Sequence, residues 1–515
     1  MARSCCLLWI GTMLLASGGS MHAAQPCARC HPAETAAFAR SPMGNSIGAP
    51  SVFSEGRIVH ALSGSTLSIK AHGSQLEHKL ERRGLVAKYQ VAYSVGAGLV
   101  GYSYIVRLGR FLYQSPASYY TQTKKWDLTP GYETETHVDF TQQISSSCLF
   151  CHTGSLNLVK GTRNQFEDPP FTAISCDRCH GSPAAHLKNP VPGSIVNPAR
   201  LPASQRDSVC EQCHLEGAVR ILNPGRDWWS FQPGENTESV FVTYLGNAAP
   251  GTLRAVSQSE LLARSQCAQQ SGGRLWCGTC HNPHASESNR AAAVRQVCLS
   301  CHAGLFAEGR HQAAAECVSC HMPRLRPTNV AHSAITDHSI PRVKRSQPLA
   351  VDVDSTPKPW REPDPGLVSR DLGLAYFDLA VTTHTGPDLN RAYDILAHLS
   401  PQQRQESIVE ADLASILLAD GRSELALRLY SRAAQQDPSN ARYAYCLGAA
   451  LGRAGKTADA IQELRRSIAL DPSQRDPYLA LSDLYKKAGR ESDSREVLRE
   501  YLRFMPQNID IRSAE

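Results

Sequence analysis

The chain has 515 residues with 18 cysteines, and its 53 basic and 47 acidic residues leave a formal charge of only +6. This length exceeds what one hydrophobic core usually contains, so we expect two or three domains. The near balance of charge, without a basic run or an aromatic-spaced basic patch, argues against a nucleic-acid partner.

Residues 1–24 are typical of a secretory signal peptide. Arg3 precedes an apolar stretch from Cys6 to Ala16, and small residues continue to Ala24. The stretch is too short for a stable membrane span, and Cys5 and Cys6 lack the context of a lipid-attachment site. We therefore expect cleavage near Ala24, export to the periplasm or an equivalent compartment of a bacterium, and no integral membrane segment in the mature protein.

Seven Cys-x-x-Cys-His motifs follow this segment. Their cysteines are Cys27, Cys30, Cys148, Cys151, Cys176, Cys179, Cys210, Cys213, Cys277, Cys280, Cys298, Cys301, Cys317 and Cys320. Their histidines are His31, His152, His180, His214, His281, His302 and His321. Two thiols three positions apart form thioethers to the two vinyl groups of one haem, and the next residue places an imidazole on the iron.

Two other readings of Cys-x-x-Cys are less satisfactory. Structural zinc needs paired motifs that supply four ligands, and seven is an odd number of half-sites. Neither zinc nor a redox dithiol explains a histidine after every second cysteine. The sequence therefore predicts seven covalently attached haem c groups, with the motif histidines as proximal iron ligands.

The first motif stands apart from the rest, because the second begins only at Cys148. Between them, residues 65–71, 85–93, 102–108 and 111–114 alternate apolar and polar side chains and are separated by glycine. This pattern predicts a small antiparallel sheet. We interpret residues 25–147 as a module for the first haem with a β-rich insertion.

The other six motifs lie close together in residues 148–342. Such density leaves little room for a side-chain core, so we expect haem stacking and short helices, each opened by a motif, to provide much of the packing. The predicted fold class is α+β: a loop-rich, mainly helical multihaem region with a small antiparallel insertion, followed by an all-α solenoid of repeats.

Each haem iron has a sixth coordination position, and histidines outside the motifs are the natural ligands. The candidates are His186, His284, His311, His332, His338, His137 and His60, together with the thioether of Met43. Most irons would then have two histidine ligands, whereas a methionine would raise the potential of the first haem. The ordinary alternatives are a surface histidine and, for Met43, a methionine packed in a core.

After a linker at residues 343–365, the pattern becomes helical with a 34-residue period. Three windows align without gaps, at 407–440, 441–474 and 475–508, and all three have proline at position 32 and a small residue at position 8. This is typical of tetratricopeptide repeats, and the preceding residues from 366 resemble a degenerate helical pair. No helix is expected after Asn508, so the end of the array would be open.

Several stretches resemble a known family. They are Gly101-Tyr-Ser-Tyr-Ile-Val-Arg107, Trp126-Asp-Leu-Thr-Pro-Gly-Tyr132, Cys148-Leu-Phe-Cys-His152, Cys176-Asp-Arg-Cys-His-Gly181, Val196-Asn-Pro-Ala-Arg-Leu201, Cys280-His-Asn-Pro-His284 and Cys320-His-Met-Pro-Arg324. Together with the repeats, they resemble bacterial multihaem c-type cytochromes that carry C-terminal tetratricopeptide repeats. The resemblance implies that His186 and His284 are distal ligands, often to a neighbouring haem.

The beginning of the mature chain, from Cys27 to Gly44, is similar to the haem module of the tetrahaem electron carrier of ammonia oxidation. In that module the position of Met43 is usually histidine, so the sixth ligand of the first haem stays open.

Three functions of different classes are compatible with these features. We favour electron transfer between redox partner proteins, with the repeats docking a partner. The second is a multihaem oxidoreductase that acts on a small nitrogen or sulfur species at one haem with an open sixth position. The third is an assembly scaffold built on the repeats. No Cys-x-x-Cys-Lys motif occurs, and the supply of histidines permits full coordination, so a carrier is favoured over an enzyme.

Overall fold

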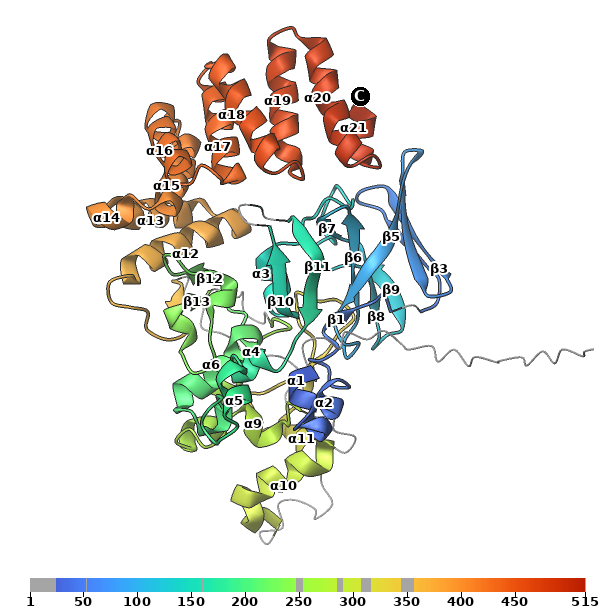
Figure 1. The fold of residues 1–515 in the computed structure, drawn as a ribbon, viewed down its shortest axis with the longest axis vertical. Helices are drawn as coiled ribbons and strands as arrows, with labels where there is room; N and C mark the ends of the chain where they lie inside the picture. Colours follow the sequence, from blue (N-terminus) through green and yellow to red (C-terminus); the bar gives the residue numbers. More distant parts are fainter. Residues whose placement is uncertain are drawn as a thin grey trace, which may run out of the picture.

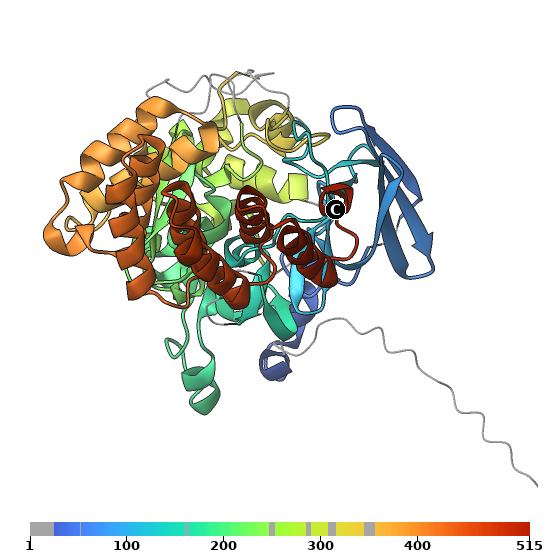
Figure 2. The ribbon, with the colours of Figure 1, turned by 90° about the horizontal axis from the view of Figure 1, so that it is seen from above.

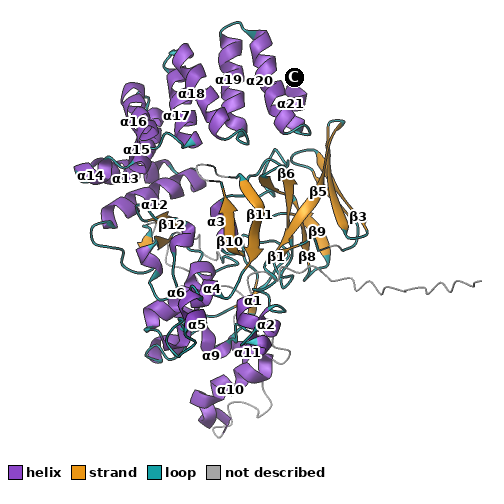
Figure 3. Cartoon of the chain, in the orientation of Figure 1, coloured by secondary structure: helices purple, strands orange, loops and turns teal. Residues whose placement is uncertain are grey.

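The computed structural model describes residues 25–514 except 52, 160, 161, 163, 247–252, 285–289, 307–315 and 344–355. His311 and most of the predicted linker lie outside the described residues. The chain has an α+β fold of helices and several small antiparallel sheets, with helical repeats at its C-terminal end (Figure 1, Figure 3). Within the described part, no helix is both long and apolar enough to cross a membrane.

A seven-stranded antiparallel sheet follows the first motif. Its strands, apart from β1, pair in the order β2 (Gly56–His60), β3 (Ser65–His72), β4 (Gln75–Arg82), β5 (Leu85–Val95), β6 (Ser103–Leu108) and β7 (Phe111–Gln114), while β1 (Ile47–Gly48) pairs with β5. The alternating side chains of β3 bury Leu67 and Ile69, as the sequence pattern predicts. Gly73 and Gly84 have φ of +62° and +77° in the tight turns, a backbone conformation that glycine adopts without steric cost.

Two further hairpins extend this β-rich part. β8 (Ala117–Tyr120) pairs with β9 (Lys125–Leu128), and β10 (Thr153–Leu158) pairs with β11 (Phe166–Ala173). The short helix α3 (Ser146–Phe150) carries the second motif directly into β10. The sheet therefore lies beside the haem motifs and not apart from them.

The six-motif region consists of short helices joined by loops. The helices from the first motif to the seventh, apart from α3, are α1 (Gln25–Ala28), α2 (Pro32–Phe38), α4 (Asp177–His180), α5 (Ala184–Lys188), α6 (Ala203–His214), α7 (Gln258–Ala263), α8 (Gln266–Gln270), α9 (Cys277–Cys280), α10 (Arg290–His302) and α11 (Cys317–His321). The expectation that each motif opens a helix is met at α9 and α11. In contrast, His214 ends α6 and His302 ends α10, so the fourth and sixth motifs close their helices.

Short strands complete this region. β12 (Val219–Leu222), β13 (Phe241–Leu245) and β16 (Lys358–Pro359) form a three-stranded sheet, and β14 (Arg324–Leu325) pairs with β15 (Ile335–Thr336). Single 3-10 turns occur at η1 (Pro198–Arg200), η2 (Trp228–Ser230), η3 (Thr237–Ser239) and η4 (Ala303–Phe306). Because β16 belongs to the predicted linker, the end of that segment is built into the haem region.

The repeats form an array of antiparallel helices. They are α12 (Val368–Thr383), α13 (Gly386–Ala397), α14 (Pro401–Arg404), α15 (Ser407–Ala419), α16 (Ser423–Gln436), α17 (Ala441–Arg453), α18 (Thr457–Leu470), α19 (Arg475–Lys487), α20 (Glu491–Phe504) and α21 (Ile509–Ala514). Each 34-residue window opens on the first residue of a helix. Gly421, Gly455 and Gly489 turn the chain between the two helices of a repeat, each with φ above +70°.

Both ends of the array are attached to the rest of the molecule. At its start, Leu374 and Ala375 of α12 pack against Ile221 and Tyr244 of the three-stranded sheet. The sequence predicted no helix after Asn508 and therefore an open end of the array, and this prediction is wrong. Helix α21 follows Asn508 and lies over the seven-stranded sheet (Figure 2). The repeats therefore span from the haem region to the β-rich insertion (Figure 1).

Candidate metal centres

Three motif histidines each face a histidine from outside the motifs. The ring centres are 6.4 Å apart for His31 and His186, 5.9 Å for His180 and His284, and 6.2 Å for His281 and His338. Two imidazoles bound to opposite sides of one metal through bonds of about 2 Å have their ring centres about 6 Å apart. Each pair therefore has the separation that one shared iron requires.

Hydrogen bonds to Nδ1 orient several of these rings. The Nδ1 atoms of His180, His338 and His321 are 2.8, 2.9 and 2.9 Å from the carbonyl oxygens of Val196, Thr336 and Pro341. When Nδ1–H donates to a carbonyl, Nε2 keeps its lone pair for a metal. The sequence between the motifs thus supplies not only ligands but also the groups that fix their orientation.

His186 is oriented by a side chain instead of a carbonyl. Its Nδ1 lies 2.8 Å from Ser194 Oγ, which itself donates to the carbonyl of Val191 at 2.7 Å. The hydroxyl proton of Ser194 is thereby used, so its oxygen accepts from Nδ1–H of His186. Nε2 of His186 is again the free nitrogen, and it belongs to the ring that faces His31.

The motif histidines His152 and His214 lie in a less polar environment. Desolvation by the surrounding protein lowers the pKa of both imidazoles, and their proximity lowers that of His152 further. The backbone of Ser46 and the side chain of Gln258 contact them. The neutral imidazole is the form that binds a metal, so this environment favours ligation.

The histidine pairs alone do not complete a metal site. In the described part of the chain, no group of three or more His, Cys, Asp or Glu side chains is arranged to hold a metal ion. Each facing pair would supply two ligands to an iron, and the other ligands would come from another source. A haem macrocycle provides four nitrogen ligands in one plane, so the residues present fit haem better than a bare metal ion.

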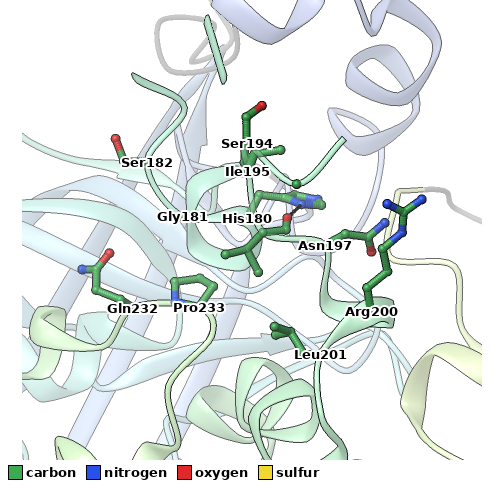
Figure 4. Close-up of a pocket in the computed structure, with 12 residues that line it drawn as sticks. His180, Gly181, Ser182, Ser194, Ile195, Asn197, Arg200, Leu201, Gln232 and Pro233 are labelled. Carbon is green, nitrogen blue, oxygen red and sulfur yellow. Dashed lines mark hydrogen bonds between the residues drawn. The ribbon is translucent and has the colours of Figure 1, made fainter. Parts of the chain in front are cut away.

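A cavity of about 430 Å³ lies against His180 (Figure 4). Its lining includes apolar side chains of Ile195, Val196 and Leu201, and the polar side chains of Asn197 and Arg200. Apolar walls suit the flat face of a macrocycle, and an arginine suits its carboxylate substituents. The position of this cavity, beside one member of a facing histidine pair, is consistent with a haem site.

Cysteines of different motifs contact one another. The sulfur atoms are in hydrogen-bond contact in four pairs: Cys27 with Cys176, Cys151 with Cys213, Cys210 with Cys277, and Cys298 with Cys317. Cys179 also lies close to Cys210, and Cys280 close to Cys298. These contacts link the attachment points of all seven motifs into one connected cluster.

Other predicted distal ligands lie elsewhere. The ring nitrogens of His60 are 2.9 Å from Ser63 Oγ and 3.3 Å from the carbonyl oxygen of Glu133, within the β-rich insertion. Nε2 of His332 is 2.5 Å from Asp127 Oδ2, and His137 is 70 % exposed beside Asp510. The structure thus engages these three histidines in other contacts.

The residue that faces the histidine of the first motif is not the methionine that the sequence offered as a candidate ligand. Met43 is a sequence candidate for the iron beside His31, but the ring that faces His31 belongs to His186. His186 comes from α5, far along the chain, and a search within the local sequence of the first motif could not have paired them.

Sequence reasoning missed the residues between the two cysteines of each motif. Glu211, inside the fourth motif, accepts from Trp360 Nε1 at 3.1 Å and from Arg361 Nη2 at 2.5 Å. Burial raises the pKa of Glu211 to about 7, although Arg361 counteracts the shift. A charged residue at a position that most often only spaces two cysteines is the signal that could have drawn attention to it.

Family models match three parts of the chain. "Cytochrome c554 and c-prime" matches residues 114–181, "Doubled CXXCH motif" matches 270–306, and "Tetratricopeptide repeat" matches 453–515. The first two are cytochrome models that cover haem motifs, and the third covers the end of the array.

Several proteins are similar to short shares of the chain. "Cellulose synthase operon protein C" of Pseudomonas fluorescens (strain SBW25) is 28 % identical over 115 residues, which are 22 % of this chain and 9 % of that protein. The crystal structure of MamA is 17 % identical with a TM-score of 0.25, over 28 % of this chain and 74 % of MamA. YrrB, a TPR protein with an unusual peptide-binding site, is 15 % identical with a TM-score of 0.24, over 28 % and 73 %.

Proposed function

We propose that this multihaem c-type cytochrome with C-terminal tetratricopeptide repeats is an exported seven-haem electron carrier whose repeats dock a partner protein. The facing histidine pairs carry the proposal. An iron with an imidazole on each side has no position left for a substrate, so it exchanges electrons only. Haem c, when bound, supplies the one-electron iron couple.

The proposed ligand assignment follows the three pairs. His31 and His186 hold the first haem, His180 and His284 the third, and His281 and His338 the fifth. In each pair, the second histidine comes from the segment after a later odd-numbered motif. This exchange would tie consecutive parts of the chain together, and the fourteen motif cysteines would fix each haem covalently.

The proposed iron ligands of the other four haems rest on the motif sequences and, for His321, on a hydrogen bond that orients the ring. His152, His214, His302 and His321 are proposed as proximal ligands of the other four haems. Nδ1 of His321 lies 2.9 Å from the carbonyl oxygen of Pro341, which orients the ring. His311, outside the described residues, stays a candidate for a distal position.

The connected cluster of cysteine contacts supports a carrier over a set of isolated redox sites. Electron transfer between haems requires that they lie close together, and six contacts join the attachment points of all seven motifs. The repeats support the docking part of the proposal, because such repeats mediate protein contacts. The signal-like residues 1–24 and the haem attachment support export.

Spin state tests the proposal. Electron paramagnetic resonance of the oxidised, matured protein should give low-spin signals, with seven haems per chain by mass spectrometry. His186→Ala, His284→Ala and His338→Ala should each convert one haem to high spin, because each removes one of two axial ligands. His398→Ala is the matched control, since His398 lies in the repeats with Nδ1 2.6 Å from the carbonyl oxygen of Asp394.

Two outcomes would contradict the proposal. An unchanged spectrum in any of the three variants would remove that histidine from the ligand set. A high-spin signal of one haem per chain in the wild-type protein would reveal an open iron, and assays with nitrite, hydroxylamine and sulfur oxyanions would then favour the oxidoreductase alternative.

A further inference from the structure

The second, third and fourth motifs are directly bonded to one another through the residues between their cysteines. Arg178, from the third motif, donates from Nη2 to the carbonyl of Phe150 in the second motif at 3.1 Å. Its guanidinium also lies 4.3 Å from the centre of the Phe150 ring. Gln212, from the fourth motif, donates from Nε2 to the carbonyl of Arg178 at 3.1 Å.

A second arginine reaches the same place from strand β12. Arg220 donates from Nη1 to the carbonyl of Gln212 at 3.0 Å and from Nη2 to the carbonyl of Leu215. Its guanidinium lies 5.1 Å from the ring centre of Phe241. Its Nε atom is buried without a hydrogen-bond partner. Carbonyl oxygens and aromatic faces therefore hold both arginines, and these groups do not cancel a full positive charge.

The two charges lie at the attachment points of two haems. Arg178 is bonded to the carbonyl of Phe150, which directly precedes Cys151, and Arg220 is bonded to the carbonyl of Gln212, which directly precedes Cys213. Among the described residues, neither arginine forms an ion pair within 4.0 Å of a carboxylate, although the carboxylate of Glu216 interacts with Arg220 at longer range. Arg361 differs in this respect, because it pairs with Glu211 and with Glu238.

A positive charge that is not paired with a carboxylate at close range changes the balance between the two oxidation states of a nearby haem. Reduction adds one negative charge to the haem, and a nearby cation stabilises the reduced state more than the oxidised one. In a partly buried site, one charge about 10 Å away shifts this equilibrium on the order of tenfold. Arg178 is 8 % exposed, so water screens it little.

We propose that Arg178 and Arg220 make the haem sites of the second and fourth motifs the highest-potential sites of the chain, where electrons collect. The proposal rests on the electron-transfer function proposed above and deepens it, because it assigns a direction within the cluster. Electrons that enter at the first motif or at the sixth and seventh motifs would move towards the contact between Cys151 and Cys213.

The test is a potentiometric titration of the matured protein, followed by optical absorption and electron paramagnetic resonance. Arg178→Gln and Arg220→Gln should each lower the highest one or two midpoint potentials by about 59 mV. This shift corresponds to a tenfold change in the equilibrium constant for one-electron reduction. Arg178→Lys and Arg220→Lys keep the charge and should keep the potentials. Arg274→Gln is the matched control, because Arg274 is exposed three residues before Cys277 and its charge is screened.

Each other result overturns the proposal. Unchanged potentials in both glutamine variants would show that the charges do not act on the haems. Equal shifts in the lysine and glutamine variants would show a packing effect, and a shift confined to low-potential haems would place the electron sink elsewhere. None of these results changes the outcome of the spin-state test. The proposed carrier function and the proposed position of the highest-potential haems can therefore be refuted separately. If one glutamine variant does not mature, the other and both lysine variants still decide.

Discussion

At the scale of single residues, the histidines of this chain differ in what their ring nitrogens contact. Several that face a motif histidine or belong to a motif are oriented through Nδ1, as for His180 with Nδ1 at the carbonyl oxygen of Val196. His60 has protein partners on both nitrogens, and His332 has Asp127 on Nε2. A ring that faces a motif histidine therefore separates the candidate ligands from histidines such as His60 and His332, whose nitrogens contact other groups of the protein.

His78 of β4 serves the fold in a way that depends on pH. It is 0 % exposed, with Nδ1 2.6 Å from Ser115 Oγ, the rings of Tyr104 and Trp126 against it, and Nε2 without a partner. Burial lowers its pKa from 6.5 to about 3. As pH falls, the unfolded chain therefore binds a proton at His78 at a higher pH than the folded protein does. The folded state loses stability as pH falls from about 6.5 towards 3.

We predict that His78→Gln removes this part of the pH dependence. Between pH 6 and 4, the wild-type protein should lose about 1.4 kcal/mol of unfolding free energy per pH unit more than the variant. Urea unfolding of the matured protein at several pH values measures the difference. His72→Gln is the control, because His72 is exposed at the end of β3. Parallel pH profiles for wild type and His78→Gln would contradict the prediction.

Local patterns identified which residues carry the chemistry, but not their partners. The motif spacing predicts every proximal histidine, because attachment to haem constrains residues within a single turn. The partner of His31 is His186, and that of His281 is His338, and such pairs depend on how distant loops pack. His186 and His284 were nevertheless expected as distal ligands from the family resemblance, and both face a motif histidine.

At the scale of elements, the small residue at position 8 of each repeat marks where the two helices of a repeat approach. In the last repeat, Ser482 Oγ lies 2.8 Å from Ser494 Oγ of the partner helix. In the middle repeat, a Cβ atom on Gly448 would lie 2.8 Å from Leu464 Cγ and 3.0 Å from Leu464 N. The second contact is with backbone, so the neighbouring helix would have to move.

We predict that Gly448→Ala destabilises the repeats. Overpacking of this kind costs about 1–3 kcal/mol, and the gain in helix propensity of about 1 kcal/mol offsets only part of it. Gly452→Ala, on the same helix, is the matched control, because its Cβ would meet only side-chain atoms of Leu484. Thermal unfolding followed by circular dichroism compares them. A melting temperature of Gly448→Ala equal to or above that of Gly452→Ala would refute the prediction.

The sequence predicted the repeat helices better than the helices of the haem region. A 34-residue period repeats the same packing three times, and each copy reinforces the pattern. The short haem helices have no such period, and their bounds follow from packing around the attachment points. This explains why the fourth motif ends α6 although a motif was expected to open a helix.

At the scale of the whole molecule, the array of repeats is not a separate arm. Tyr478 and Tyr501 of the last repeat and Leu80 and Tyr89 of the sheet belong to one hydrophobic cluster. Arg82 pairs with Asp510, and Arg512 donates from Nη1 to the carbonyl of Val86 at 3.0 Å. The sequence could not reveal this closure, because residues more than 400 positions apart meet in it.

The contacts of residues 358–361 with the haem region show whether the haem region and the repeats are independent domains. The linker predicted at residues 343–365 implies that a cut there would release a fully loaded haem fragment. In the structure, Lys358 and Pro359 pair with β13, and Trp360 and Arg361 contact Glu211 of the fourth motif. The haem region and the repeats therefore share contacts on both sides of such a cut, which argues against simple release.

The last helix provides the sharpest test of this closed architecture. Ile509 and Ile511 are each 2 % exposed and pack into the cluster that includes the sheet. Replacing a buried isoleucine by alanine costs about 2–5 kcal/mol. We predict that Ile511→Ala increases amide hydrogen exchange in β4 and β5, which are far away in sequence, as well as in α20 and α21. Exchange measured by mass spectrometry on the matured protein locates the effect.

Val381→Ala is the control for this exchange experiment, because Val381 is 55 % exposed at the other end of the array. It should leave the sheet unchanged. If Ile511→Ala increased hydrogen exchange only in α20 and α21, the sheet would be stable without the repeats. The last repeat and the sheet would then be in contact but would unfold independently. A rise in β4 and β5 would instead mean that the sheet and the last repeat unfold together, since the same apolar cluster stabilises both. A partner that docks on the repeats would then stabilise the β-rich insertion next to the first haem motif as well.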